Sequence, residues 1–269
     1  MTEQLHPDDV PIRPAATVML VRDAPEGPDG IEVFMMRRTG RATFGAGMYV
    51  FPGGRVDGAD AADDIAPFCR GLDDADASRQ LGIDQGGLAF WLAAVRECFE
   101  EAGVLLAERR DGGPLTLRND DRHAVHDGEL SLAALCARDD LVLDLSQVHY
   151  VDHWITPKGE GQRRFDTRFF LTEAPDDQEP LHDDKETVDS VWVRPEEALR
   201  LAEAGELMMM PPTIANLRFL LPCATADEAM AAGAAVVDPP TILPKLRFGE
   251  DGGIAGIVMP GEPGYDELP

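Results

Sequence analysis

The sequence predicts an α+β fold in which a mixed β-sheet is covered by helices. Short apolar runs typical of strands and longer helical segments follow one another irregularly, without the strict strand–helix–strand order of a fully parallel sheet. Hydrophobic residues form 44% of the 269-residue chain and charged residues 28%, which is usual for a globular protein. A chain of this length can bury roughly three-quarters of its unfolded surface, so we expect a core that needs no disulfide.

Six apolar runs bounded by glycine, proline or other turn residues are predicted to be β-strands. In chain order these runs are Ala15–Arg22, Glu32–Arg38, Met48–Phe51, Val148–Ile155, Arg164–Thr172 and Val188–Val193. Pro52-Gly53-Gly54 is expected to end the third run in a tight turn. Residues 157–161 are expected to turn the chain between the fourth and fifth runs.

The segment Leu88–Ala102 is the strongest helix prediction, because its apolar residues recur at helical spacing along one face. Gly103 follows at the position where a left-handed helix cap is expected. The other predicted helices are a short one near Asp74–Leu81, one within Asp120–Ala137, and Pro195–Ala204, which has proline in its first turn.

The chain is strongly acidic, with 50 Asp and Glu against 24 Lys and Arg and a formal net charge of −26. This balance argues against a nucleic-acid partner, whose binding needs a basic surface, and against docking on anionic membranes. An anionic substrate is still allowed, because divalent cations can hold one at a carboxylate-rich site. The four cysteines form no CxxC pair, so zinc and iron–sulfur sites are not expected.

The N-terminal residues carry no basic start followed by an apolar run, and no stretch approaches the ~20 apolar residues of a membrane span. We therefore expect a cytoplasmic protein with no membrane partner. The expected partner is a small molecule, and we allow for a homodimer.

Glu97, Glu100 and Glu101 occupy positions i, i+3 and i+4 near the end of the strongest predicted helix. At this spacing the carboxylates project from one face, opposite the apolar stripe, and they repel one another unless a cation neutralises them. Hard divalent ions with oxygen ligands, Mg²⁺ or Mn²⁺, suit such a cluster, and Arg96 could orient one carboxylate. The alternative is a solvated acidic face, which is the commoner arrangement on an amphipathic helix.

The segment Arg96–Val104, RECFEEAGV, resembles the second half of the Nudix hydrolase box, G-x5-E-x7-R-E-U-x-E-E-x-G-U, where U is a bulky apolar residue. Gly54 matches the start of the first half, and five residues later Asp60 stands where the box has glutamate. Counted back from Arg96 instead, the glutamate position falls on Leu88, so this glutamate is either replaced by aspartate or lost. Residues 58–87 then form an insertion within the box. The resemblance implies the Nudix α/β/α sandwich with a mixed sheet. It also implies an enzyme that hydrolyses a nucleoside diphosphate derivative by attack of water on a phosphorus.

The Nudix resemblance further implies a metal site. Glu97 and Glu101, together with Glu100 and the backbone carbonyl of Gly54, would bind Mg²⁺ or Mn²⁺. Arg96 would hold Glu97 in place.

The catalytic base is expected at one of two places. Some Nudix enzymes use a glutamate of the box, which here is Glu97 or Glu100. Others use a glutamate on a later loop, ahead of a strand that carries a tryptophan. Glu186, which precedes Trp192, fits the second place, and the alternative is that Glu186 is an ordinary surface residue.

The chain also resembles, more narrowly, the animal peroxisomal Nudix enzymes that cleave coenzyme A, which likewise carry an insertion in the box. The similar segments are VFPGGRVD, WITP with RRFDTRFF, ETVDSVWVRPEEAL and PGEPGY. They imply coenzyme A or acyl-CoA as substrate, and phosphopantetheine (or its acyl form) and adenosine 3′,5′-bisphosphate as products. Arg38 and Arg41, ahead of FPGG, and Arg168, within RRFDTRFF, are the expected substrate-binding residues.

Other substrates and another class of function stay open at this point. The same box occurs in Nudix enzymes for ADP-ribose, NADH, dinucleoside polyphosphates and oxidised nucleotides, and some Nudix-like domains sense nucleotides without catalysis. We expect a flexible N-terminal arm over residues 1–13 and a Nudix domain over 14–204. A C-terminal extension over 205–269 is expected to pack on the core as added helices and a short hairpin.

Overall fold

A mixed β-sheet lies at the centre of the computed structural model, which describes residues 9–25, 30–40, 45–118, 120–183, 186–250 and 252–269. The strands of this sheet are β1 (Ile12–Asp23), β2 (Ile31–Arg38), β3 (Tyr49–Val50), β4 (Gly53–Arg55), β8 (His149–Ile155), β9 (Arg164–Glu173), β10 (Thr187–Val193) and β11 (Thr241–Ile242). Their order is β10-β2-β1-β9-β8-β11, with β3 beside β2 and β4 beside β1. β1 is parallel to β9, and β8 to β11, whereas the other neighbours are antiparallel, which confirms the predicted α+β class.

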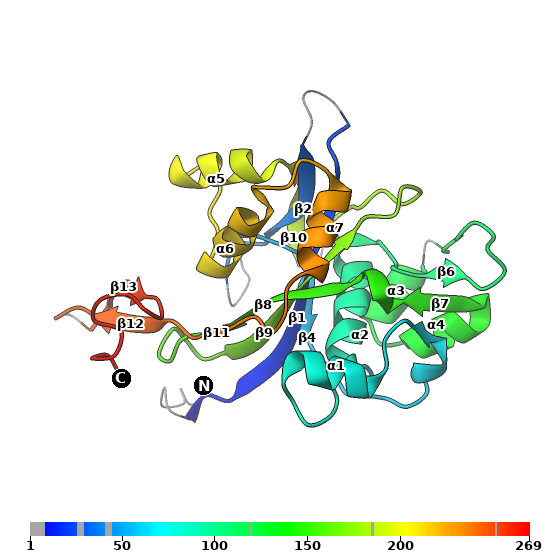
Figure 1. The fold of residues 1–269 in the computed structure, drawn as a ribbon, viewed down its shortest axis with the longest axis horizontal. Helices are drawn as coiled ribbons and strands as arrows, with labels where there is room; N and C mark the ends of the chain where they lie inside the picture. The colour runs from blue at the N-terminus through cyan, green and yellow to red at the C-terminus, as the bar shows by residue number, and fades with distance from the viewer. Residues whose placement is uncertain (1–8, 26–29, 41–44, 119, 184–185, 251) are drawn as a thin grey trace.

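Helices cover both faces of the sheet (Figure 1), so the predicted α/β/α sandwich is confirmed. The core on the first face is shared with α1 (Asp74–Leu81), α2 (Leu88–Glu97), α3 (Asp121–His126) and α4 (Leu132–Asp139). The core on the second face is shared with α5 (Pro195–Glu203), α6 (Pro211–Leu220) and α7 (Ala226–Ala234).

Strand β1 contributes to both cores. Val18 and Leu20 lie in the first core, Met19 and Val21 lie in the second, and all four are fully buried. A strand that is buried on both faces needs an uninterrupted apolar run instead of an alternating one. This requirement explains the sequence VMLV, which is part of the run that predicted the strand.

β1 begins earlier than the sequence predicts. Ile12 and Arg13 fall within the predicted flexible arm, yet they pair with Arg164 and Phe165 of β9. The strand is therefore longer than the predicted run, because the backbone ladder with β9 continues through Ile12, Arg13 and Pro14. Residues 1–8 of the predicted arm lie outside the described part of the chain.

The sequence predicts a turn at Pro52-Gly53-Gly54, whereas the structure has strand β4 there. Gly53 and Gly54 pair with Thr17 and Ala16 of β1. A Cβ atom on Gly53 would lie only 2.6 Å from the backbone oxygen of Ala16. Glycine is needed because two backbones approach closely, a contact that the local sequence does not reveal.

The strongest predicted helix is divided in two. α2 ends at Glu97, and Cys98–Ala102 continue as a single turn of π-helix. The Arg122 side chain donates hydrogen bonds to the backbone carbonyls of Glu100 and Glu101, at 2.9 and 2.7 Å. These bonds supply partners for carbonyls at the end of the helix. Single π turns often occur at functional sites, and this one sets the positions of two glutamates.

The insertion folds back onto the start of α2. The carboxylate of Asp74 accepts hydrogen bonds from the backbone amides of Gly86 and Leu88, both at 3.0 Å. The insertion therefore returns the chain to a fixed point at the start of α2. Because of this return, Asp60 and Arg96 come together although the insertion separates them in sequence.

Two smaller sheets complete the structure. The first contains β5 (Cys69–Arg70), β7 (Leu141–Asp144) and β6 (Glu108–Arg109), and the second is a hairpin of β12 (Lys245–Phe248) and β13 (Ile254–Val258). The hairpin lies at the opposite end of the molecule from α1–α4 (Figure 1). Within the described ranges, no helix has the length and apolar character needed to cross a bilayer.

Candidate active site

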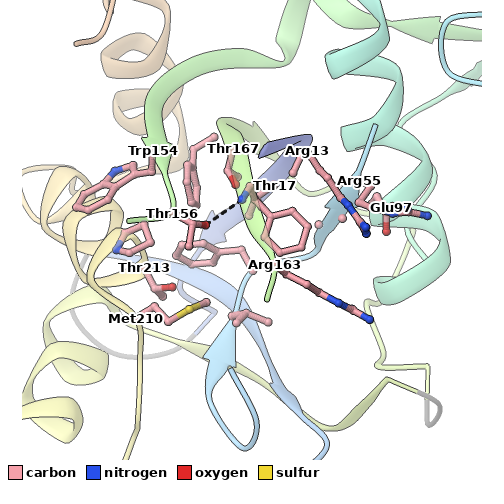
Figure 2. Close-up of a pocket in the computed structure, with 18 of the residues that line it drawn as sticks. Arg13, Thr17, Arg55, Glu97, Trp154, Thr156, Arg163, Thr167, Met210 and Thr213 are labelled. Atoms are coloured by element: carbon pink, nitrogen blue, oxygen red, sulfur yellow. Dashed lines mark hydrogen bonds between the residues drawn. The ribbon is translucent and has the colours of Figure 1, made fainter. Parts of the chain in front are cut away.

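A cavity of about 820 Å³ lies where the second face of the sheet meets the end of α2. Its floor is formed by side chains that alternate along the strands, including Thr17 of β1, Thr167 of β9 and Trp154 of β8 (Figure 2). Residues Met210–Thr213, at the start of α6, and Ile257 of β13 form part of its wall. The C-terminal extension therefore takes part in the cavity.

Three carboxylates line this cavity although they are almost fully enclosed. Glu97, Glu100 and Glu101 are only 9%, 8% and 4% exposed. α2 itself is buried on every side, so the acidic face expected opposite an apolar stripe does not meet bulk water. The alternative of a solvated acidic face is therefore wrong, and enclosed charges of one sign require counter-charges.

Arg96 provides the counter-charge for two of the glutamates. Its Nη1 donates to Glu97 Oε1 at 2.8 Å and to Glu100 Oε1 at 3.1 Å. Nε and Nη2 donate to the two carboxylate oxygens of Asp60, at 2.8 and 2.9 Å, and Nη2 also donates to the carbonyl of Arg55. Asp60 is 5% exposed, so this bidentate pair is buried. The aspartate thus braces Arg96 from the position where the box has glutamate.

The third glutamate is held by the backbone of β4. The amide of Gly53 donates a hydrogen bond to Glu101 Oε2 at 2.9 Å. The next residue, Gly54, lies directly against Glu97, and a Cβ atom on Gly54 would be 2.4 Å from Glu97 Oε1. The two glycines therefore allow a peptide backbone to run beside the carboxylates, where a side chain would displace them.

Burial raises the pKa of all three glutamates. It raises the pKa of Glu97 to about 7, although the charge of Arg96 acts in the opposite direction. The pKa of Glu101 is raised well above its ordinary value by burial and by the charge of Glu97. Burial also raises the pKa of Glu100, against the effect of Arg96. A cation bound among these groups would favour their ionised forms.

The donor chemistry of this cluster fits a hard divalent cation. Carboxylate and peptide oxygens are the ligands that Mg²⁺ and Mn²⁺ prefer, and Glu97, Glu100, Glu101 and Gly54 all line the cavity. Across the residues that the structure describes, no three Asp, Glu, His or Cys side chains already converge closely enough to hold an ion. Binding a cation therefore requires the glutamates to exchange some of their present hydrogen bonds for metal contacts.

Comparison with known proteins identifies the family. The NUDT19 Nudix domain family matches residues 68–220, which is more than half of the chain and includes α2 and the π turn. The chain belongs to the Nudix hydrolases. Two relatives are acyl-coenzyme A diphosphatases NUDT19. The protein from Gallus gallus is 28% identical over 308 residues, which are 96% of this chain and 80% of the relative. The protein from Homo sapiens is 28% identical over 324 residues, which are 99% of this chain and 84% of the relative.

A solved structure agrees with this family. The crystal structure of a Nudix hydrolase from Alicyclobacillus acidocaldarius has a TM-score of 0.71 and 30% identity, and the match covers 86% of this chain and all of that chain. These matches confirm the Nudix resemblance, and with it a pyrophosphohydrolase as the class of enzyme. The family match continues past residue 204, so the boundary between the Nudix domain and the extension stays a prediction.

The fold brings one distant glutamate to the Nudix site. Glu186 lines the same cavity, its side chain is 51% exposed, and its Oε2 lies 3.8 Å from Nη2 of Arg38. Arg38 also lines the cavity, and its charge acts to lower the pKa of Glu101. Arg41, the other arginine predicted ahead of FPGG to bind substrate, lies outside the described residues.

Arg168 is not at this site, which corrects its predicted contact with substrate. Thr167 and Phe169 face the cavity, so the residue between them on β9 points to the opposite face of the sheet. There Arg168 is 4% exposed, donates a hydrogen bond to Asp166, and lies over the ring of Phe90, 5.5 Å from its centroid. The Arg168 guanidinium group therefore interacts with Asp166 and Phe90 and not with the cavity.

The cavity also contains basic residues that the sequence analysis does not single out. Arg13, Arg55 and Arg163 lie on the side of the cavity where Glu97 stands (Figure 2). Alternation along β1 is the sequence signal that could have indicated Arg13. His126 has no such signal: its Nδ1 lies 3.7 Å from Glu100 Oε2 because α3 packs beside the π turn.

Proposed function

We propose that this Nudix hydrolase cleaves the diphosphate of coenzyme A or acyl-CoA, giving phosphopantetheine, or its acyl form, and adenosine 3′,5′-bisphosphate. The observation that supports this substrate is the extent of the likeness to acyl-coenzyme A diphosphatases, which reaches 96% and 99% of this chain. Such a likeness includes the insertion and the C-terminal extension. It therefore goes beyond the box, which Nudix enzymes for different substrates share.

The contrast between the two ends of the cavity also supports this substrate. The end at β4 and α2 carries the glutamates with Arg55 and Arg96, which suits a diphosphate. The end at β8 and α6 carries apolar side chains, including Trp154, Phe169 and Met210. A pantetheine or acyl chain can lie against such a surface, since burial of its methylene groups is favourable.

We further propose that Glu97, Glu100, Glu101 and the carbonyl of Gly54 hold Mg²⁺ or Mn²⁺. A bound divalent ion neutralises charge on the diphosphate and lowers the pKa of a bound water. The protein's own part is to orient the ligands. Arg96 fixes the direction of Glu97 through its hydrogen bond, and the π turn determines where the other two carboxylates point.

We favour Glu186 over Glu100 as the base that accepts a proton from the attacking water. Glu100 is enclosed and hydrogen-bonded to Arg96, which restricts its movement. Glu186 is half exposed and can exchange its proton with solvent between turnovers. We expect Glu186→Gln to lower kcat by about 10²-fold. Wild-type kcat in Glu186→Gln would exclude Glu186 as the base.

Product analysis tests the proposed reaction. The protein is incubated with coenzyme A, an acyl-CoA, ADP-ribose and NADH, each with Mg²⁺, with Mn²⁺ and with EDTA, and the products are identified by mass spectrometry. We expect the highest kcat/KM with coenzyme A or its ester, the two products named above, and no turnover in EDTA. A tenfold higher kcat/KM with ADP-ribose or NADH would contradict the substrate. Tight nucleotide binding without turnover would indicate a sensor instead of an enzyme.

A further inference from the structure

Two arginine side chains on the cavity wall have no partner among the described residues. Arg13 and Arg163 line the cavity, and neither guanidinium group forms a hydrogen bond or an ion pair with another residue that the structure describes. Arg38 and Arg96, on the same wall, are instead paired with glutamates. Since the chain has 50 acidic residues, carboxylate partners are abundant. The charges of Arg13 and Arg163 are left available to an anion that enters from solution.

The strand register places these two arginines close together. Arg13 of β1 is the register partner of Phe165 of β9, and Arg163 precedes Phe165 by two residues. Arg13 and Phe165 share the face that forms the cavity floor, and Arg163, in the loop just before β9, lines the same cavity. Arginine side chains are long, so two that line the same cavity can contact one shared ligand.

Arg13 and Arg163 come from different elements than the glutamates, although Glu97 lies on the same side of the cavity (Figure 2). The glutamates and Arg96 stand at the end of α2, whereas Arg13 and Arg163 belong to the end of β1 and the β8–β9 loop. Glu160 of the same loop also lines the cavity, and burial raises its pKa. The wall therefore offers two guanidinium groups, from elements other than α2, to an anionic substrate in this cavity.

We propose that Arg13 and Arg163 bind the phosphomonoester on the ribose of the substrate. This inference rests on the proposed function, because coenzyme A carries such a group in addition to its diphosphate. Guanidinium groups donate paired hydrogen bonds to phosphate oxygens in a geometry that a single ammonium cannot match. Arg13 and Arg163 are then specificity-determining residues, which separate coenzyme A from ADP-ribose, NADH and dephospho-coenzyme A.

Matched substrates test the phosphate site. The measured quantity is kcat/KM for coenzyme A divided by kcat/KM for dephospho-coenzyme A, which lacks only the phosphomonoester. We expect this ratio to be well above one in the wild type, and to fall about tenfold in Arg13→Gln and in Arg163→Gln. Arg79→Gln removes the same charge from the exposed surface of α1 and is expected to keep the wild-type ratio. Arg13→Lys should give an intermediate ratio.

The outcomes separate this inference from the proposed function. An equal loss with both substrates in the two glutamine variants would overturn the inference, because the arginines would then act on the diphosphate or on the fold. If the wild type cleaves neither substrate, the proposed function fails. In that case, the affinities for adenosine 3′,5′-bisphosphate and for AMP, measured by calorimetry, test whether Arg13 and Arg163 bind the phosphomonoester. Tighter binding of the bisphosphate that both variants lose would support the inference, and equal binding of the two nucleotides would overturn it.

Discussion

Replacing Asp60 by asparagine removes the brace behind Arg96. The carboxylate accepts hydrogen bonds from Arg96 at 2.8 and 2.9 Å and from the amide of Asp57 at 2.8 Å, in a site that is 5% exposed. Breaking a buried ion pair costs about 3–5 kcal/mol. Because Arg96 keeps its bonds to Glu97 and Glu100, we expect a value near the lower limit, about 3 kcal/mol. For a chain of this size that loss corresponds to a fall in Tm of roughly 6–12 °C.

Urea unfolding of the metal-free protein, followed by tryptophan fluorescence, measures this effect. Asp57→Asn is the matched control, because the Asp57 side chain is 50% exposed and lies 3.6 Å from Arg55. Such an exposed pair contributes little, so the control should change the unfolding free energy by less than about 1 kcal/mol. If Asp60→Asn were as stable as this control, the reasoning that the aspartate replaces the box glutamate as a structural brace would be refuted.

Three further results are expected. With saturating Mg²⁺, Glu97→Gln and Glu101→Gln should each lower kcat by about 10²-fold or more. The exposed control Glu203→Gln should keep the wild-type kcat. Near-wild-type kcat in the Glu97→Gln and Glu101→Gln variants would remove both residues from the site. Gly54→Ala should lower kcat by at least tenfold, because the added Cβ would lie 2.4 Å from Glu97 Oε1. Gly58→Ala is the control, since a Cβ at Gly58 would have no atom within 4 Å. Equal kcat values for the two variants would contradict the close approach of Gly54 to Glu97. In EDTA, the unfolding free energy should fall as pH rises from about 5 to 7. Burial raises the pKa of Glu97 to about 7 in the folded state, above its ordinary value. Ionisation of Glu97 in this pH range therefore disfavours the folded state. Glu97→Gln should reduce this slope, and an identical slope in that variant would exclude Glu97 as its source.

The parts of the fold that local sequence determines could be predicted. The apolar run of β1 and the spacing along 88–102 indicated the elements correctly, and Gly103 adopts the left-handed conformation expected of it, with φ of 72°. The π turn could not be foreseen, since its carbonyls are satisfied by Arg122, a residue that arrives through tertiary packing.

The candidate site was predictable to the extent that it lies in one segment. The three box glutamates and Arg96 lie within one short segment, whereas the cavity floor is assembled from β1, β8 and β9. Arg13 and Arg168 illustrate the difference. Both lie on strands of the central sheet, but only Arg13 has the alternation that points into the cavity. A shift of one residue along a strand exchanges the two faces, and only the register of the sheet decides which face is used.

The central claim is that the buried carboxylates at the end of α2 bind a divalent cation. Calorimetric titration of Mn²⁺ into the EDTA-stripped protein tests it most directly. Since the chain carries a net charge of −26, weak binding at other carboxylates must be subtracted, and the exposed pair Glu203→Gln/Glu206→Gln serves as the control. We expect saturable binding that weakens at least tenfold in Glu97→Gln/Glu101→Gln and persists in the control. Identical isotherms for the wild type and the Glu97→Gln/Glu101→Gln variant would contradict the claim.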